Sequence, residues 1–180
     1  MTTRPSVIVT GANSGIGKEI ASRLARSGYD VAINYKVDAP AAQALAQELR
    51  AHGGRAVSIY ADISVAADVD TMFSTVLAEF GKLDALVNNA GMQVFKPLLE
   101  VEEGDWDRVI ATNLRGCFLC TQCAARHMKQ RGAGAIVNIG SGSNKVPFPN
   151  LSSYTASKGA IEMFTKSSAL ELGPLGIRVN

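Results

Sequence analysis

Residues 154–158 carry two side chains whose types and spacing suit proton transfer. Tyr154 and Lys158 stand four positions apart, so on a helix they share one face. A tyrosine hydroxyl has an ordinary pKa of about 10 and is a poor base at neutral pH. A neighbouring lysine ammonium stabilises the phenolate and lowers that pKa toward the working range. Such a pair also occurs by chance in many helices, so it needs partners before it indicates a reaction centre.

Two further polar residues are candidates for those partners. Ser141 comes just after a strand expected over residues 135–139, at the end where open α/β sheets bind ligands. Its hydroxyl could bond a substrate carbonyl or hydroxyl. Asn113 lies inside a helix expected over residues 105–130. It could hold a water that leads protons to Lys158, or it could be an ordinary satisfied helix asparagine.

Residues 10–17 read Thr-Gly-Ala-Asn-Ser-Gly-Ile-Gly and join the first expected strand to the first expected helix. This arrangement predicts a dinucleotide site. Gly11 allows the tight turn, Gly15 lets the backbone approach a pyrophosphate, and Gly17 lets the helix pack closely on the strand. The helix N-terminus then presents free N–H groups to the phosphates. A purely structural glycine turn is the alternative. A triphosphatase loop is disfavoured because Glu19 follows Lys18.

The end of the second expected strand selects between the two nicotinamide cofactors. An acidic residue there would bind a ribose 2′-hydroxyl, and a basic one a 2′-phosphate. Tyr35 stands where the acidic residue would be expected, and Lys36 follows it. Asp38 is too far along the chain to take that place. We therefore expect NADP in preference to NAD, unless Lys36 is merely a solvated loop lysine. Asp62, after the third strand, could accept a hydrogen bond from the adenine amino group.

Apolar β-branched runs alternate with helical patterns along the whole chain. The expected strands are residues 7–10, 31–34, 56–60, 83–88, 135–139 and 177–180, and the expected helices are 15–27, 41–52, 67–80, 105–130 and 153–172. Glycines mark the helix ends. The pattern predicts an α/β fold, a Rossmann-type doubly wound parallel sheet in one domain over residues 1–180. Because the chain stops within the sixth strand, we expect truncation there, a short natural edge strand being the alternative.

Composition excludes several classes of protein. The 180 residues include 18 Lys plus Arg and 16 Asp plus Glu, for a net charge of +2, too little for a nucleic-acid or membrane-surface binder. No run approaches the ~18 apolar residues of a membrane span. Three cysteines argue against a disulfide framework. We expect a cytoplasmic protein with a small-molecule partner.

Cys117, Cys120 and Cys123 are spaced three apart, with His127 following, as in some metal-ligand runs. The stretch reads as one helix, however, with no glycine after Gly116 to form a ligand loop. Free cysteines on one helix face behave as small buried hydrophobes. We expect no metal site.

Taken together, residues 10–17, Asn88-Asn89-Ala90-Gly91, Asn113, Ser141 and Tyr154-x-x-x-Lys158 resemble the short-chain dehydrogenase/reductase family, in register over all 180 residues. The resemblance implies reversible hydride transfer between an alcohol or carbonyl and NAD(P). It makes Asn113 the relay, Ser141 the substrate-orienting group, Tyr154 the acid/base, and Lys158 the residue that tunes Tyr154 and binds the nicotinamide ribose. The cofactor-binding residues it implies are Gly11, Asn13, Ser14, Gly15, Ile16, Gly17, Lys36, Asp62, Ile63, Asn89, Ala90, Gly91, Tyr154 and Lys158.

Family members continue past the sixth strand with a Pro-Gly turn, a substrate-covering lid and a final strand, so the resemblance implies that the C-terminal part is absent. It also implies a homotetramer for the full-length protein, with the helix that carries the cysteines at a subunit interface.

The segment after Ser141 forms one wall of the family's substrate pocket. Its Lys-Val-Pro-Phe-Pro run, residues 145–149, is similar to that of bacterial glucose 1-dehydrogenases. We therefore expect glucose as the substrate. The runner-up is a 3-oxoacyl-carrier-protein reductase, which Gly140-Ser141 resembles. A non-catalytic dinucleotide-binding module is the third alternative.

Overall fold

The computed structural model describes residues 4–180 and contains one parallel sheet in the order β3-β2-β1-β4-β5-β6. This is the strand order of a doubly wound dinucleotide-binding fold. The strands are β1 (Ser6–Val9), β2 (Asp30–Tyr35), β3 (Ala56–Tyr60), β4 (Ala85–Asn88), β5 (Gly134–Asn138) and β6 (Ile177–Val179). The expected α/β architecture is confirmed, with β4 starting two residues later than the sequence predicts.

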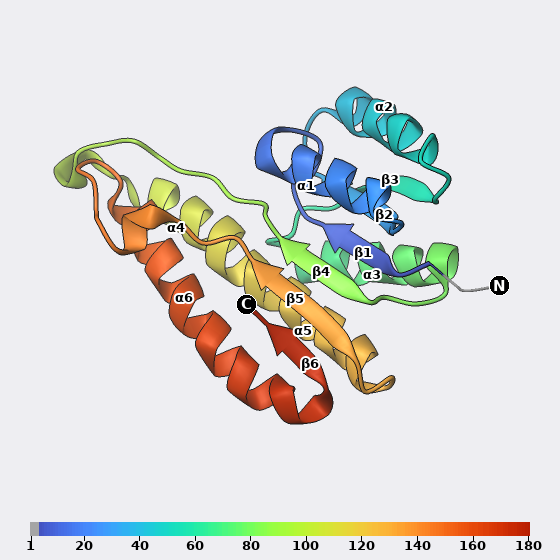
Figure 1. The fold of residues 1–180 in the computed structure, drawn as a ribbon. Coiled ribbons are helices and arrows are strands. Elements are labelled where there is room, and N and C mark those ends of the chain that lie inside the picture. The colour runs from blue at the N-terminus through green and yellow to red at the C-terminus, as the bar shows by residue number, and fades with distance from the viewer. Residues whose placement is uncertain (1–3) are drawn as a thin grey trace.

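Helices cover both faces of the sheet (Figure 1). They are α1 (Gly15–Arg26), α2 (Ala39–Arg50), α3 (Ala66–Phe80), α4 (Glu103–Ile110), α5 (Gly116–Lys129) and α6 (Ser152–Leu172). Along β1, the side chains of Val7 and Val9 belong to the apolar cluster built with α1 and α2. Ile8 belongs to the cluster built with α3 and α5 on the other face. This period-two alternation divides the core into two layers.

The prediction of one continuous helix over residues 105–130 is wrong in the interior of that range. α4 passes into a π-helical segment, η2 (Ala111–Arg115), before α5 begins. A π-helical turn inserts one extra residue and is common at functional sites. Hydrophobic periodicity does not show it, because neighbouring turns still bury the same face. Asn113 lies at its centre.

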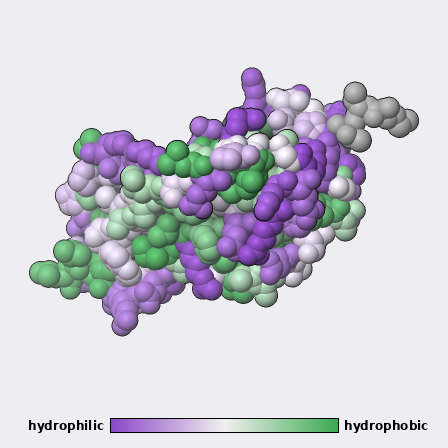
Figure 2. Space-filling view, turned by 90° about the horizontal axis from the view of Figure 1, so that it is seen from below, coloured by the Kyte–Doolittle hydropathy of each residue, from purple (hydrophilic) through white to green (hydrophobic). Residues whose placement is uncertain are grey.

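Short 3-10 turns complete the chain at η1 (Leu98–Glu100), η3 (Gly142–Asn144) and η4 (Gly173–Leu175). The loops around η1 and η3 lie side by side, since Lys96 N–H donates to the Asn150 carbonyl at 3.0 Å. Large apolar side chains are exposed on both loops, including Phe95 and Phe148. Figure 2 shows apolar atoms protruding at the left end of the molecule, where the η1 loop lies in Figure 1.

Candidate active site

The carboxyl ends of β1 and β4 meet where the strand order reverses, and there the two strand ends are joined by side-chain bonds. The Thr10 hydroxyl oxygen accepts hydrogen bonds from the backbone N–H groups of Asn89 and Ala90, both at 3.0 Å. The Asn89 side-chain amide donates to the carbonyls of Thr10 at 2.9 Å and Gly11 at 3.1 Å. A crevice at such a point is the ligand site of open α/β sheets.

The glycine turn after β1 depends on the absence of side chains. Gly11 has a φ of +60°, and its N–H donates to the Asn34 side-chain oxygen at 3.1 Å. A Cβ at Gly17 would lie 2.5 Å from both Asn89 Nδ2 and the Gly11 carbonyl oxygen. Gly15 has a φ of +53° and open space around it. The turn therefore leaves bare backbone facing the crevice.

The N-terminus of α1 is available to an anion. Ser14 precedes the helix with an extended backbone and makes no capping bond with its side chain, and the first turn carries no acidic residue. The first N–H groups of α1 therefore lack a side-chain acceptor, and the helix dipole is not offset. This arrangement and the bare glycine turn both fit a dinucleotide pyrophosphate. Asn13 fixes the turn by donating to the Val37 carbonyl at 3.1 Å.

Lys36 and Asp62 were predicted to bind separate parts of the cofactor. They form an ion pair with 2.6 Å between Lys36 Nζ and Asp62 Oδ2. Burial alone would raise the pKa of the Asp62 carboxyl, but hydrogen bonds from Lys36 and Ser64 outweigh it and hold the pKa below its usual range. Lys36 remains largely exposed. The Ile63 side chain is buried in the core, so only its backbone is left to meet a ligand.

Tyr154 and Lys158 lie in one open cleft of about 240 Å³ with Ile16, Asn89 and Gly91. The Lys158 Nζ is 5.8 Å from the centroid of the Tyr154 ring, and it donates to the Ile139 carbonyl at 2.6 Å. Burial lowers the pKa of the Lys158 ammonium. The shared helix face expected from their spacing is thus observed, and Ile16, in the first turn of α1, lines the same cleft as Tyr154 and Lys158.

Ser141 comes directly after Gly140, which lines the same cleft. Its oxygen accepts two bonds from Ser143, one from the backbone N–H at 3.2 Å and one from the hydroxyl at 3.0 Å. A hydroxyl has two lone pairs and one hydrogen. Because both lone pairs are used, the hydrogen is what Ser141 has left to offer a substrate oxygen.

Asn113 uses its side chain for contacts within the protein. Its oxygen accepts from Met92 N–H at 2.8 Å, and its nitrogen donates to the Met92 carbonyl at 2.9 Å and to Ser157 Oγ at 3.0 Å. The expected water relay toward Lys158 stays a prediction. The residue's visible effect is to fix the backbone at Met92, which lines the cleft.

Sequence reasoning missed four residues that line the cleft, Met92, Gln93, Ile139 and Gly140. Each follows a strand end, and their position one to five residues past β4 or β5 is the only signal that could have found them. It also missed the structural roles of Thr10 and Asn34, which depend on contacts between distant strands.

The three cysteines of the run lie on α5. Cys117, Cys120 and Cys123 are buried free thiols, and burial raises the pKa of Cys117 and Cys123 to about 11. Within residues 4–180 no group of three metal-ligating side chains comes together. In the same range, no helix is long and apolar enough to cross a bilayer.

Comparison with known proteins agrees with this geometry. Residues 5–180 match the family model for short chain dehydrogenase. A 3-oxoacyl-[acyl-carrier-protein] reductase of Staphylococcus aureus is 42% identical over 175 residues, which are 97% of this chain and 71% of that protein. Acetoin dehydrogenase from Enterobacter cloacae superposes with a TM-score of 0.94 at 40% identity, over 100% of this chain and 72% of that one. A NAD+-bound xylitol dehydrogenase superposes with a TM-score of 0.94 at 34% identity, over 100% and 70% of the two chains. The chain therefore belongs to the short-chain dehydrogenase/reductase family, whose members are nicotinamide-dependent oxidoreductases acting on CH–OH and carbonyl groups.

Proposed function

We propose that this chain interconverts a secondary alcohol and its ketone, with Tyr154 as the acid/base. The observation that carries the proposal is the joint position of Tyr154, Lys158 and the α1 side of the crevice in one cleft. The glycine turn and the α1 N-terminus would hold the pyrophosphate, and Lys158 the nicotinamide ribose. When bound, the nicotinamide supplies the chemistry of a hydride acceptor or donor.

The chain's own residues handle the proton and the substrate oxygen. In alcohol oxidation the carbon loses a hydride, two electrons with one proton, and the Tyr154 phenolate takes the hydroxyl proton. The Lys158 ammonium stabilises that phenolate. The Ser141 hydroxyl donates a hydrogen bond to the substrate oxygen as that oxygen becomes a carbonyl. In reduction, Tyr154 returns the proton to the oxygen.

We propose a 3-oxoacyl chain as the first substrate class, ahead of glucose. The S. aureus relative is named for that substrate, and the loops beside the cleft expose Phe95, Val146 and Phe148, which suit an apolar chain better than a sugar. The Lys-Val-Pro-Phe-Pro run at residues 145–149 still favours glucose as the second candidate.

The test is absorbance of the nicotinamide with purified protein, offering acetoacetyl thioester, glucose and simple ketones, each with NAD(H) and NADP(H). We expect the thioester to be reduced faster than glucose is oxidised. Faster glucose oxidation would reverse the order. NADPH binding by calorimetry with no turnover of any substrate would instead support a non-catalytic binding module.

We also propose NADP over NAD, self-association and a cytoplasmic setting. The exposed side chain of Lys36 supports the preference for NADP.

An apolar groove of about 280 Å³ between α5 and α6, lined in part by Phe118, Phe164 and Leu175, offers a surface for a homotetramer. Three free thiols suit a reducing compartment. Light scattering of the native protein and of a Phe118→Asp variant tests the assembly, which the substitution should weaken.

A further inference from the structure

Ser157 is a buried polar residue that the proposed reaction does not use. It is 0% exposed and lies in the first turns of α6, three residues after Tyr154 and one before Lys158. A buried hydroxyl in a helix needs a partner, and its bonding pattern shows what it connects.

The hydroxyl of Ser157 makes one bond in each direction. It donates to the backbone carbonyl of Tyr154 at 2.7 Å. It accepts from the Asn113 side-chain nitrogen at 3.0 Å. It therefore ties the turn that carries Tyr154 to the π-helical segment η2.

Asn113 continues the connection to the opposite wall of the cleft. Its nitrogen has two hydrogens, one for Ser157 and one for the Met92 carbonyl, and its oxygen accepts from Met92 N–H. Met92 and Tyr154 both line the cleft. A continuous series of hydrogen bonds thus runs from the Met92 backbone through Asn113 and Ser157 to the Tyr154 backbone.

We propose that Ser157 is a positioning residue that fixes the separation between the Met92 wall and the Tyr154 wall of the cleft. The inference rests on the proposed function, since it gives Ser157 an effect through Tyr154. Without the hydroxyl, the Asn113 nitrogen loses a buried acceptor and α6 loses its tie to η2. Tyr154 is then held less closely to substrate and to Lys158. Because a displacement of about 1 Å can cost about a hundredfold in rate, we expect a large effect from a small loosening.

The test compares Ser157→Ala with Ser168→Ala, a control that removes another buried serine of the same helix. We expect Ser157→Ala to lower kcat by about tenfold to a hundredfold with a much smaller change in KM. The pH of half-maximal kcat for alcohol oxidation should move to higher pH, because the phenolate is less well stabilised. Ser157→Thr, which keeps the hydroxyl, should restore most of kcat and most of the wild-type pH profile. Ser168→Ala should leave kcat and the pH profile unchanged.

A readout without turnover separates this inference from the proposed function. The Met92 amide is hydrogen-bonded to Asn113, and in Ser157→Ala it should lose protection from hydrogen exchange, as it should not in Ser168→Ala. If wild-type protein turns over no substrate, the proposed function fails and the exchange experiment still decides whether the walls are coupled. If Ser157→Ala does not fold, Ser157→Cys, with its weak donor, replaces it in both measurements. An unchanged pH profile, kcat and Met92 exchange in a folded variant would overturn the inference.

Discussion

The hydrogens and lone pairs that individual residues leave free determine what the cleft can bind. Lys158 has three N–H donors, and within residues 4–180 one of them goes to the Ile139 carbonyl. Ser141 has given both lone pairs to Ser143. Lys158 therefore presents donors in the cleft that Tyr154 also lines, and Ser141, next to the cleft residue Gly140, has a donor left to offer. Such a set suits ligand oxygens, of a ribose and of a carbonyl.

Removing the Tyr154 hydroxyl tests its assignment as the acid/base. We expect Tyr154→Phe to lower kcat by about 10²–10⁴-fold, the usual contribution of a positioned acid or base, while NADPH binding is largely kept. Tyr60→Phe, a change at an exposed tyrosine on β3, is the matched control and should behave like wild type. Steady-state kinetics and calorimetry measure the two effects. Wild-type turnover by Tyr154→Phe would show that the assignment is wrong.

The Lys36 side chain carries the cofactor preference in our proposal. A charged hydrogen bond to a 2′-phosphate contributes about 1.5–3 kcal/mol, so Lys36→Ala should weaken NADPH binding by about tenfold to a hundredfold. NADH lacks that phosphate, and its Kd in the same variant is the internal control and should barely change. Equal weakening of both cofactors would instead indicate that the variant disturbs Asp62, the ion-pair partner of Lys36.

At the scale of elements, the packing of α1 on β1 and β4 depends on Gly17. A Cβ there would lie 2.5 Å from Asn89 Nδ2 and the Gly11 carbonyl oxygen, so Gly17→Ala must push α1 away from the turn. We expect it to lower the free energy of unfolding by about 1–3 kcal/mol and to weaken cofactor binding. Gly104→Ala, in α4 with nothing within 4 Å of the new Cβ, should do neither. Urea unfolding and calorimetry test both variants.

The sequence predicted those elements whose signals are local. Glycines at a strand-helix junction, β-branched runs and the Tyr154–Lys158 spacing each depend on residues close in the chain, and the sheet and the cleft followed from them. The π-helical segment η2 was not predicted. Its local sequence is helical, and its distortion accompanies bonds from Asn113 to Met92 and Ser157, which are 21 and 44 residues away in the chain. Such contacts leave no periodic signal.

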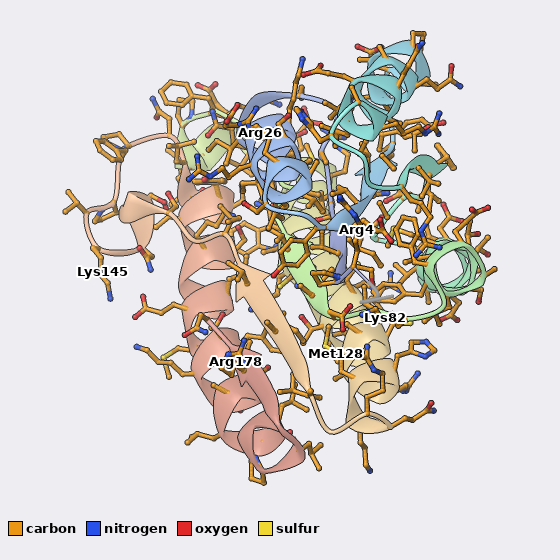
Figure 3. The ribbon with its side chains drawn as sticks, turned by 45° about the vertical axis from the view of Figure 1, so that its right-hand side comes forward. Arg4, Arg26, Lys82, Met128, Lys145 and Arg178 are labelled. Atoms are coloured by element: carbon orange, nitrogen blue, oxygen red, sulfur yellow. The ribbon has the colours of Figure 1, made fainter. Side chains whose placement is uncertain are left out.

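On the scale of the whole molecule, the loop after Ser141 is attached to α6 by charge. Glu162, two turns after Tyr154 on α6, accepts hydrogen bonds from Lys145 at 2.8 Å and Lys166 at 2.7 Å, and from Asn144. Lys145 lies on the loop between β5 and α6 (Figure 3). The bonds from Asn144 and Lys145 connect a long surface loop to the helix that carries Tyr154, whereas the bond from Lys166 lies within α6. The loop bonds therefore bear on the stability of the fold and on the cleft wall.

Ionisation of Glu162 should make part of the stability depend on pH. Hydrogen bonds from Lys145 and Lys166 lower the pKa of its carboxyl from 4.5 to about 2 in the folded protein. A carboxyl with a lowered folded pKa stabilises the protein above its unfolded pKa, and the contribution is lost as the pH falls through the folded value. The window for Glu162 is therefore from about 4.5 down to about 2.

Glu162→Gln removes this contribution and should be less stable than wild type at pH 7, with a difference that shrinks as the pH falls through that window and vanishes at its lower end. Salt should reduce the difference, because the pairs are partly exposed. The measurement is the urea midpoint of both proteins across the pH series. Glu171→Gln, on the same helix, is the matched control. Its carboxylate accepts from Ser167 at 3.2 Å and makes no ion pair within residues 4–180, so its difference from wild type should stay small at every pH. A Glu162→Gln difference that persisted unchanged to the lowest pH would mean that the amide loses shape or hydrogen bonds rather than charge.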